Sequence, residues 1–337
     1  MSATNLSADL KSTKKKILVT GGAGYIGAHC CKALAERGYE PLVFDNFVTG
    51  HRKFIQWGEF FEGDICSSDD LSECFNRHPV DAVLHFAGFI EVGESVKNPA
   101  KYYANNVGGS LQLLMAVVAH GVRKFIFSSS AAVYGHPQQV PIEENHPLSP
   151  VNPYGWTKFV VEKMLADFQT AHHLRWTALR YFNAAGADTS GRIGEQHDPE
   201  SHLIPRMLDA ALNGAKKVSI FGTDYPTADG TCVRDYIHVS DLARAHVLAL
   251  EYLNSGGASN VFNLGQARGY SVKEVIKTAS AVTGVKIPVQ NEARRPGDPA
   301  ELVASNQKAK RLLGWKPSES SLENILQSAF DWHRTLK

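Results

Sequence analysis

The chain has 337 residues, of which 43% are hydrophobic, and its 35 basic residues nearly balance its 34 acidic residues. At roughly 150 residues per domain, this length allows two domains with sizeable cores. Because there is no excess of positive charge, the sequence offers no general attraction for phosphate backbones or anionic lipids. We therefore expect neither nucleic acid nor a membrane as a partner.

The ends and the cysteines of the chain predict a cytoplasmic protein. No run of apolar residues approaches the ~18 that a membrane span needs, and the first residues lack the apolar segment of a secretory signal. The five cysteines are an odd number without CxxC spacing, which predicts neither a disulfide framework nor a zinc site. Residues 1–15 are polar and predict a flexible leader.

Strand-like and helix-like segments alternate from residue 16 to about residue 180. Amphipathic helices are predicted around 26–34 and 111–118, and short apolar runs predict strands at 17–19, 41–44, 60–62, 82–85 and 124–127. Such an alternation is typical of a doubly wound parallel sheet of the Rossmann type, covered by helices on both faces. We predict that residues 16–180 form a dinucleotide-binding α/β domain.

The second half of the chain differs from the first in composition. Its loops are rich in Gly, Asp and Pro, and helical patterns return at 241–253, 272–282, 307–313 and 322–332. We predict that residues 181–337 form a smaller C-terminal substrate-binding α/β domain, and that segments near 235–265 return to the first half. A substrate would then bind in a cleft between the two halves.

The segment TGGAGYIG follows the first predicted strand and opens the first predicted helix. Its glycines Gly21, Gly24 and Gly27 allow a tight turn and a close approach of backbone amides to a pyrophosphate. Asp45 ends the second predicted strand, where a carboxylate binds ribose hydroxyls and repels a 2′-phosphate. The pattern therefore predicts NAD rather than NADP.

Two further strand ends are candidates for cofactor contacts. Asp64 and Ile65 follow the third predicted strand, where a carboxylate and a backbone amide could bind the adenine edge. The fourth strand ends in HFAG, whose small residues allow a close backbone approach. Taken alone, both segments could equally be ordinary turns.

A serine, a tyrosine and a lysine form the candidate catalytic group. Ser130 follows the fifth predicted strand, and Tyr154 and Lys158 stand four residues apart, on one face of a helix. An adjacent ammonium stabilises a phenolate, so we expect Lys158 to lower the pKa of Tyr154 toward neutrality. The tyrosine could then remove a proton from a hydroxyl, with Ser130 bound to the same oxygen.

The motifs TGGAGYIG, HFAG, SSSAAVYG and YxxxK, in this order, resemble those of the extended short-chain dehydrogenase/reductases. Within that family the segments YFNAAGA, ESHLIP, FGTDYPTADGTCVRDYIHVSDLA, FNLG and ARRPGD are similar to those of the UDP-glucose 4-epimerases. The resemblance covers roughly residues 16–335 and makes 181–337 the UDP-sugar-binding domain.

The resemblance implies an NAD-dependent isomerase of galactose metabolism, which interconverts UDP-glucose and UDP-galactose. Tyr154 would take the proton of the sugar 4-hydroxyl while a hydride passes from carbon 4 to NAD. The 4-keto sugar would turn and receive the hydride on its other face, so that the net redox change is zero. The resemblance also implies a homodimer, formed by the helix around Leu111 and the helix beginning near Tyr154.

The resemblance further implies two sets of site residues. Those that would contact NAD are Gly21, Gly24, Tyr25, Ile26, Gly27, Asp45, Asn46, Asp64, Ile65, Phe86, Ala87, Gly88, Asn105, Ser128, Tyr154, Lys158 and Tyr181. Those that would contact the UDP-sugar are Ser130, Tyr154, Asn183, Leu203, Phe221, Arg234, Arg295 and Asp298. Guanidinium groups suit a diphosphate, an aromatic ring suits uracil, and a carboxylate suits ribose hydroxyls.

Three residues depart from the family pattern. Ile90 stands where many of these enzymes have a lysine that helps to bind NAD, which implies a weaker hold on the cofactor. His202 replaces a common asparagine beside Leu203. Leu302 lies, within one position, on the wall whose bulk decides whether an N-acetyl group fits, so N-acetylated sugars remain candidates.

Alternative functions remain open at this point. A 4,6-dehydratase would need an Asp-Glu pair where Ala131 and Ala132 stand. A 4-epimerase of UDP-N-acetylglucosamine, UDP-xylose or UDP-arabinose, or UDP-glucuronate would differ only in pocket shape, and a non-catalytic NAD sensor would share the fold. The 14 histidines show no HExxH spacing, so we expect no metal.

Overall fold

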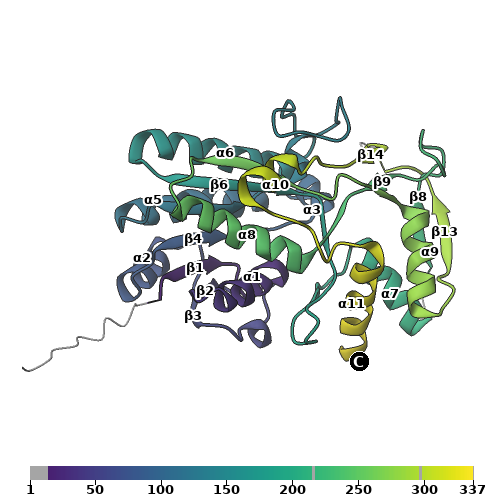
Figure 1. Ribbon diagram of the computed structural model, residues 1–337, viewed down its shortest axis with the longest axis horizontal. Helices are drawn as coiled ribbons and strands as arrows, with labels where there is room; N and C mark the ends of the chain where they lie inside the picture. Colours follow the sequence, from purple (N-terminus) through teal and green to yellow (C-terminus); the bar gives the residue numbers. More distant parts are fainter. Residues whose placement is uncertain (1–13, 215–216, 296–297, 337) are drawn as a thin grey trace, which may run out of the picture.

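The computed structural model describes residues 14–214, 217–295 and 298–336 (Figure 1). The predicted leader, residues 1–15, lies almost entirely outside the described residues. No helix within the described ranges is long and apolar enough to span a membrane.

A parallel sheet of seven strands forms the larger half of the molecule, which confirms the predicted fold class. Its strand order is β11-β6-β5-β4-β1-β2-β3. The strands are β1 (Lys16–Thr20), β2 (Glu40–Asp45), β3 (Glu59–Glu62), β4 (Ala82–His85), β5 (Lys124–Ser128), β6 (Arg175–Tyr181) and β11 (Asn260–Leu264). The order reverses between β1 and β4, and ligands of such sheets bind at the carboxyl ends of the strands near this reversal.

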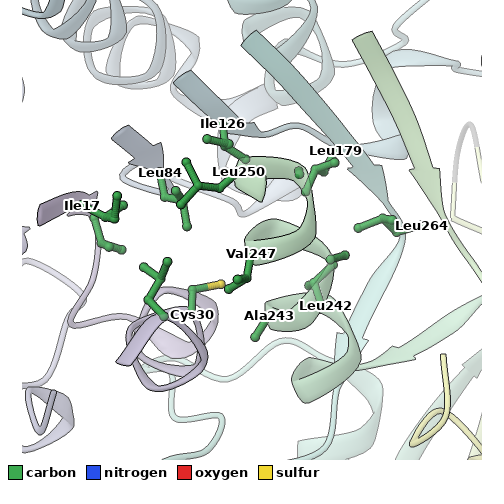
Figure 2. Close-up of a cluster of buried hydrophobic side chains, with 14 of the residues drawn as sticks. Ile17, Cys30, Leu84, Ile126, Leu179, Leu242, Ala243, Val247, Leu250 and Leu264 are labelled. Carbon is green, nitrogen blue, oxygen red and sulfur yellow. The ribbon is translucent and has the colours of Figure 1, made fainter. Parts of the chain in front are cut away.

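Helices cover both faces of this sheet. One face carries α1 (Tyr25–Glu36), α8 (Val239–Asn254) and α10 (Gln307–Leu313), and the other carries α2 (Ser68–Arg77), α5 (Ser110–Ala119) and α6 (Pro153–His172). Short helices α3 (Val92–Lys97) and α4 (Pro99–Tyr102) and a π-helical segment, Tyr103–Gly109, lead into α5. Figure 2 shows α1 and α8 side by side against the strands.

The apolar strands are buried on both faces because their side chains alternate. Ile17 and Val19 of β1 pack in the core with α1 and α8, whereas Leu18 packs in the core on the opposite face. In β4, Leu84 likewise packs in the core with α1 and α8, and Val83 packs in the core on the opposite face. A strand with a core on each face therefore appears in the sequence as an uninterrupted apolar run.

The second half is built from small sheets and three helices. The strand pairs are β7 (Asn183–Ala185) with β10 (Tyr236–His238), and β8 (Val218–Phe221) with β13 (Val289–Glu292). A third small sheet joins β12 (Tyr270–Ser271), β9 (Val233–Arg234) and β14 (Glu301–Leu302). Helices α7 (Leu203–Asn213), α9 (Val272–Thr283) and α11 (Leu322–Thr335) enclose the core of this half.

The chain crosses between the two halves more than once. After β10 it returns to the large sheet, where α8 packs on α1 and β11 pairs with β6, before it leaves again for β12. Residues far apart in the sequence are therefore placed on one framework. A division into two domains near residue 181 remains our interpretation of the chain.

Candidate active site

The residues predicted to bind the cofactor lie at one edge of the large sheet. Strands β1, β2, β4, β5 and β6 end at Thr20, Asp45, His85, Ser128 and Tyr181. Because these strands are parallel, their carboxyl ends meet at the same edge. The glycine turn, HFAG and Ser128 are thereby brought together, although more than one hundred residues separate the first from the last.

At the glycine turn, two backbone segments lie in close contact. Gly21 has φ +71°, and a Cβ atom there would lie 2.6 Å from the amide nitrogen of Ala87. At Gly27 a Cβ atom would lie 2.2 Å from the carbonyl oxygen of Gly21. Side chains are excluded at both positions by backbone rather than by movable groups, so glycine is required there.

The N-terminus of α1 is open to an anion. Gly24, the N-cap residue, has no side chain that could satisfy the first turn. Among the described residues, no acceptor faces the backbone N–H groups of Tyr25 and Ile26. Free amides at a helix N-terminus are a binding site for a pyrophosphate, so this turn fits NAD.

The side chain of Tyr25 makes its contacts outside the glycine turn. Its hydroxyl donates to the carbonyl oxygen of Gly186 at 2.6 Å, and its ring meets the ring of His197 edge-on. Only the backbone of Tyr25 therefore remains for the predicted cofactor contact.

Asp45 holds the glycine turn against the end of β2. Its two carboxylate oxygens accept hydrogen bonds from the amides of Ala23, at 3.0 Å, and Phe47, at 2.9 Å. Burial raises the pKa of Asp45, and these two hydrogen bonds act against that rise. Each oxygen keeps a free lone pair, which fits the predicted binding of ribose hydroxyls.

The other predicted adenosine contacts lie beside Asp45. The amide of Asn46 donates to Asp64 at 3.0 Å, which joins the ends of β2 and β3. Ile65 is buried, and Asn105 lies in the π-helical segment, where its amide donates to Asn106 at 3.0 Å. The side chain of Asn105 lies 3.9 Å from the sulfur of Cys66, which follows Ile65, so these predicted NAD contacts adjoin one another.

Tyr154 and Lys158 lie in the first turns of α6. Pro153 occupies the first turn, and the Asn152 side chain accepts from the amide of Gly155 at 2.8 Å, so the helix starts at this point. The Lys158 ammonium is buried and donates to the carbonyl oxygen of Ser128 at 2.8 Å. Burial lowers the pKa of Lys158 to about 8.

The pKa of Tyr154 differs from the sequence-based expectation. Burial raises it above its usual value, a hydrogen bond with Ser130 lowers it, and the charge of Glu91 raises it. The Lys158 nitrogen lies 5.8 Å from the centre of the tyrosine ring and faces Ser128 instead. Lys158 therefore does not lower the pKa of Tyr154 in this arrangement, contrary to the expectation from the spacing of the two residues.

Three hydroxyl groups surround this tyrosine and lysine. Ser128 and Tyr181 share a hydrogen bond of 2.5 Å between their hydroxyls. Ser130 begins a short 3₁₀ helix, and its hydroxyl accepts from the amide of Ala132 at 3.1 Å. The end of β5 therefore contacts β6 through the Ser128 hydroxyl and α6 through the Ser128 carbonyl oxygen.

The predicted UDP-sugar residues of the second half lie close together but pair with each other. Arg234 forms an ion pair with Asp298 at 2.5 Å. The Arg295 guanidinium lies 3.9 Å above the centre of the Phe221 ring, where we expected uracil. A bound diphosphate would compete with Asp298 for Arg234, and a base would displace Arg295 from Phe221.

The remaining predicted substrate contacts lie at element ends. Asn183 begins β7 and donates to the carbonyl oxygen of Asp235 at 2.9 Å, and Leu203 begins α7. Leu302 of β14 pairs with Arg234 of β9, so this wall residue adjoins an expected diphosphate ligand.

A buried ion pair behind Ser130 was missed by sequence reasoning. Glu162 of α6 binds Arg180 of β6 and accepts from the hydroxyl of Ser129 at 2.6 Å. Arg180 also donates to the hydroxyl of Tyr134 at 2.9 Å. The network holds both ends of the segment 129–134 and so positions Ser130.

One sequence signal could have found this pair. Glu162 follows Lys158 by four residues, as Lys158 follows Tyr154, so all three share one face of α6. A carboxylate on a helix face directed at the sheet must be paired. Its partner, Arg180, is apparent only from the pairing of β5 with β6.

Comparison with known proteins places this chain in a large group of relatives. Residues 17–265 match the model of the NAD dependent epimerase/dehydratase family. A curated UDP-glucose 4-epimerase of Rhizobium leguminosarum bv. trifolii is 54% identical over 94% of this chain and 97% of its own.

Solved structures agree with this likeness. UDP-glucose 4-epimerase from Brucella ovis in complex with NAD has a TM-score of 0.92 at 49% identity, over 94% of this chain and 97% of that one. The UDP-Glc/GlcNAc 4-epimerase of Campylobacter jejuni has a TM-score of 0.84 at 42% identity, over 95% of this chain and 99% of that one.

Glu162→Gln tests the buried ion pair. The change leaves Arg180 buried and unpaired, so we expect the free energy of unfolding to fall by about 3–5 kcal/mol, measured by urea denaturation. The control is Glu73→Gln in the exposed pair Glu73–Arg77, which should shift stability by no more than about 0.5 kcal/mol. Equal effects of the two substitutions would contradict a special role for Glu162.

Lys158→Met tests the cost of the buried ammonium. A lysine pKa lowered from 10.5 to about 8 means that the unfolded chain binds more protons than the folded protein between these values. Folding is therefore penalised below pH 8, and the penalty fades as pH rises toward 10.5. We expect the variant, free of NAD, to be more stable at pH 7 by up to about 3 kcal/mol.

Urea denaturation at pH 7 and pH 9.5 measures this gain. It should be smaller at pH 9.5, where wild type has largely lost the buried charge. A variant less stable than wild type at pH 7 would show that the hydrogen bond to Ser128 outweighs the burial of the charge.

Proposed function

The chain belongs to the NAD dependent epimerase/dehydratase family, and we propose that it interconverts UDP-glucose and UDP-galactose with NAD as a bound cofactor. The observation that carries this proposal is the placement of Ser130, Tyr154 and Lys158 together at the sheet edge that also holds the glycine turn. Curated and solved relatives of nearly full length carry the name UDP-glucose 4-epimerase, which supports the same activity.

The phenolate form of Tyr154 takes the proton of the sugar 4-hydroxyl and becomes a neutral phenol, while Ser130 binds the same oxygen. When bound, NAD would accept the hydride from carbon 4 of the sugar, and its positive charge would lower the pKa of Tyr154 and so favour the phenolate. Lys158 holds the end of β5 through the carbonyl oxygen of Ser128 and so keeps the serine hydroxyls facing Tyr154. On the return step Tyr154 gives the proton back.

The second half orients the nucleotide and leaves the hexose free. Arg234 and Arg295 bind the diphosphate, Phe221 packs against uracil, and Asp298 accepts from ribose hydroxyls once Arg234 turns to phosphate. Asn183 and Leu203 complete the proposed contacts. A firmly held UDP with a loosely held sugar lets either face of the 4-keto intermediate meet the hydride donor.

Acceptance of UDP-N-acetylglucosamine is the second candidate function. Leu302 is an aliphatic residue beside Arg234, and it packs with the apolar group that includes Ala131 and Ile142. It is smaller than an aromatic residue would be at the same place. The likeness to the UDP-Glc/GlcNAc 4-epimerase of Campylobacter jejuni supports this candidate.

We propose that the chain acts as a homodimer through α5 and the start of α6. These helices expose apolar side chains at Leu111, Met115 and Trp156, and Tyr103 lies exposed just before α5. Exposed apolar groups on neighbouring helices are typical of a surface covered by a partner.

We also propose a cytoplasmic location. The described structure contains five free cysteines, four of them buried, and buried thiols without a disulfide fit a reducing compartment. The balanced charge of the chain supports the same location.

A panel of UDP-sugars tests the proposed activity. Purified wild type should interconvert UDP-glucose and UDP-galactose without added reductant, and added NAD should raise the rate if Ile90 weakens retention. Tyr154→Phe should lower kcat by roughly 10²–10⁴-fold without loss of bound NAD, because it removes only the proton-transfer group. The matched control is Tyr252→Phe on α8, which should keep full activity.

Two outcomes of the panel would change the proposal. Turnover of UDP-N-acetylglucosamine beside UDP-glucose would establish the second candidate, and its absence would remove it. Bound NAD with no turnover of any UDP-hexose would overturn the proposed activity in favour of an NAD sensor.

Substitution of the exposed apolar residues tests the dimer. Leu111→Arg with Met115→Arg should convert the protein from dimer to monomer in analytical ultracentrifugation, because two charges would be buried at the interface. Val285→Arg, an equally exposed apolar position in the second half, is the control and should leave the dimer intact. A monomeric wild type would refute the proposed interface.

A further inference from the structure

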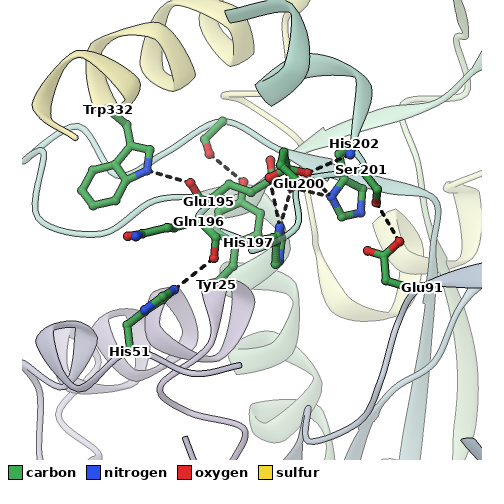
Figure 3. Close-up of polar contacts among 11 residues, drawn as sticks. Tyr25, His51, Glu91, Glu195, Gln196, His197, Glu200, Ser201, His202 and Trp332 are labelled. Carbon is green, nitrogen blue, oxygen red and sulfur yellow. Dashed lines mark hydrogen bonds and ion pairs between the residues drawn. The ribbon is translucent and has the colours of Figure 1, made fainter. Parts of the chain in front are cut away.

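Four side chains of one loop converge just before α7. Glu195, His197, Glu200 and His202 each present one possible metal-ligand atom, and all four atoms lie within 4.8 Å of one another. Figure 3 shows their contacts, which join these two carboxylates to these two imidazoles. The group, which we call the EHEH cluster, includes none of the residues proposed for the chemistry or for NAD.

The distances within the EHEH cluster fit a tetrahedral site. The Nδ1 atom of His202 lies 3.2 Å from Glu195 and 2.9 Å from Glu200, and Nδ1 of His197 lies 3.5 Å and 3.3 Å from the same two carboxylates. Ligand atoms at 2.0–2.1 Å from a tetrahedral zinc ion are about 3.3 Å apart. The four histidine–carboxylate separations lie close to this value, and the other separations, which are at most 4.8 Å, would adjust by side-chain rotation.

The burial of the Glu195 carboxylate adds to these distances. Glu195 is only 5% exposed. In the part of the chain that the structure describes, its carboxylate meets no donor other than the imidazoles of His197 and His202. A buried carboxylate normally has several polar partners, and a cation bound between it and the two imidazoles would add one more.

The backbone of the loop is already held in place. The indole nitrogen of Trp332 donates to the carbonyl oxygen of Glu195 at 2.8 Å, and a ring nitrogen of His51 lies 3.1 Å from the carbonyl oxygen of Gln196. Ser201 donates to Glu91 at 2.7 Å. These contacts come from both halves of the molecule, so the four ligands are arranged before any ion binds.

We propose that Glu195, His197, Glu200 and His202 form a structural binding site for a divalent transition-metal cation of the zinc type. Two imidazole nitrogens and two carboxylate oxygens favour such an ion over Mg²⁺ or Ca²⁺, which prefer oxygen ligands alone. Two carboxylates balance the charge of the ion when both imidazoles are neutral. Four protein ligands leave no open position, as in structural rather than catalytic zinc sites.

The site would fasten the substrate half to the cofactor half. The loop leads directly into α7, whose first residue, Leu203, is a proposed substrate contact. The same loop touches Glu91 and Tyr25, which belong to the half that carries the glycine turn. A bound ion would therefore stiffen the junction of the two halves without taking part in proton or hydride transfer.

Zinc titration of the full-length chain, free of any histidine tag and treated with a chelator, tests the proposal. We expect one equivalent of Zn²⁺ by competition with a chromogenic chelator, and a rise in Tm on binding. Glu195→Gln with His197→Gln removes two ligands and should weaken binding by roughly 100-fold or more. The controls are His172→Gln, at an exposed helix end, and Cys66→Ser, which removes an exposed thiol.

Two results would overturn the proposal. One is stoichiometric binding that survives the double substitution or that disappears in Cys66→Ser. The other, independent of whether the double variant folds, comes from crystals of the wild-type protein grown with Zn²⁺. Anomalous diffraction at the zinc edge should show a peak among the four side chains, and its absence there would refute the site.

Discussion

The close contact between the glycine turn and the end of β4 is the constraint on which the site depends. Gly21 lies so near the backbone of Ala87 that a single Cβ atom would separate the two strand ends. Because β1 and β4 are the neighbours at which the strand order reverses, this contact opens the N-terminus of α1 beside HFAG. The cofactor position follows from that geometry, and Asp45 fixes the other side of the turn.

On the other side of the same sheet edge, buried charged residues position the groups proposed for catalysis. Lys158 and Glu162 reach from α6 toward the sheet, where they bind Ser128 and Arg180. Both groups lose solvation; the charge of Arg180 compensates Glu162, whereas Lys158 has only a carbonyl oxygen as its partner and its pKa stays lowered. The segment from Ser129 to Tyr134 is thereby held at both ends, and Ser130 faces Tyr154.

In the second half, in contrast, the residues proposed to bind the substrate contact one another. The contacts of Arg234 with Asp298 and of Arg295 with Phe221 occupy the groups that a nucleotide would engage. Binding of UDP would replace these contacts with ion pairs and ring contacts to the nucleotide. The affinity for UDP would therefore depend on the difference in free energy between the two sets of contacts. The EHEH cluster lies at the junction of the two halves, where a cation would limit their relative motion.

The sequence by itself determined the alternation of strands and helices in the first half, the glycine turn, and the spacing of Tyr154 and Lys158, because each depends on local periodicity or on residue type. It could not determine the partner of Glu162, the direction of the Lys158 ammonium, or the pairing of Arg234 with Asp298. The convergence of Glu195, His197, Glu200 and His202 likewise follows no familiar ligand spacing. These features depend on strand order, on loop paths and on burial, and only the tertiary structure decides which distant groups meet and which of them lose water.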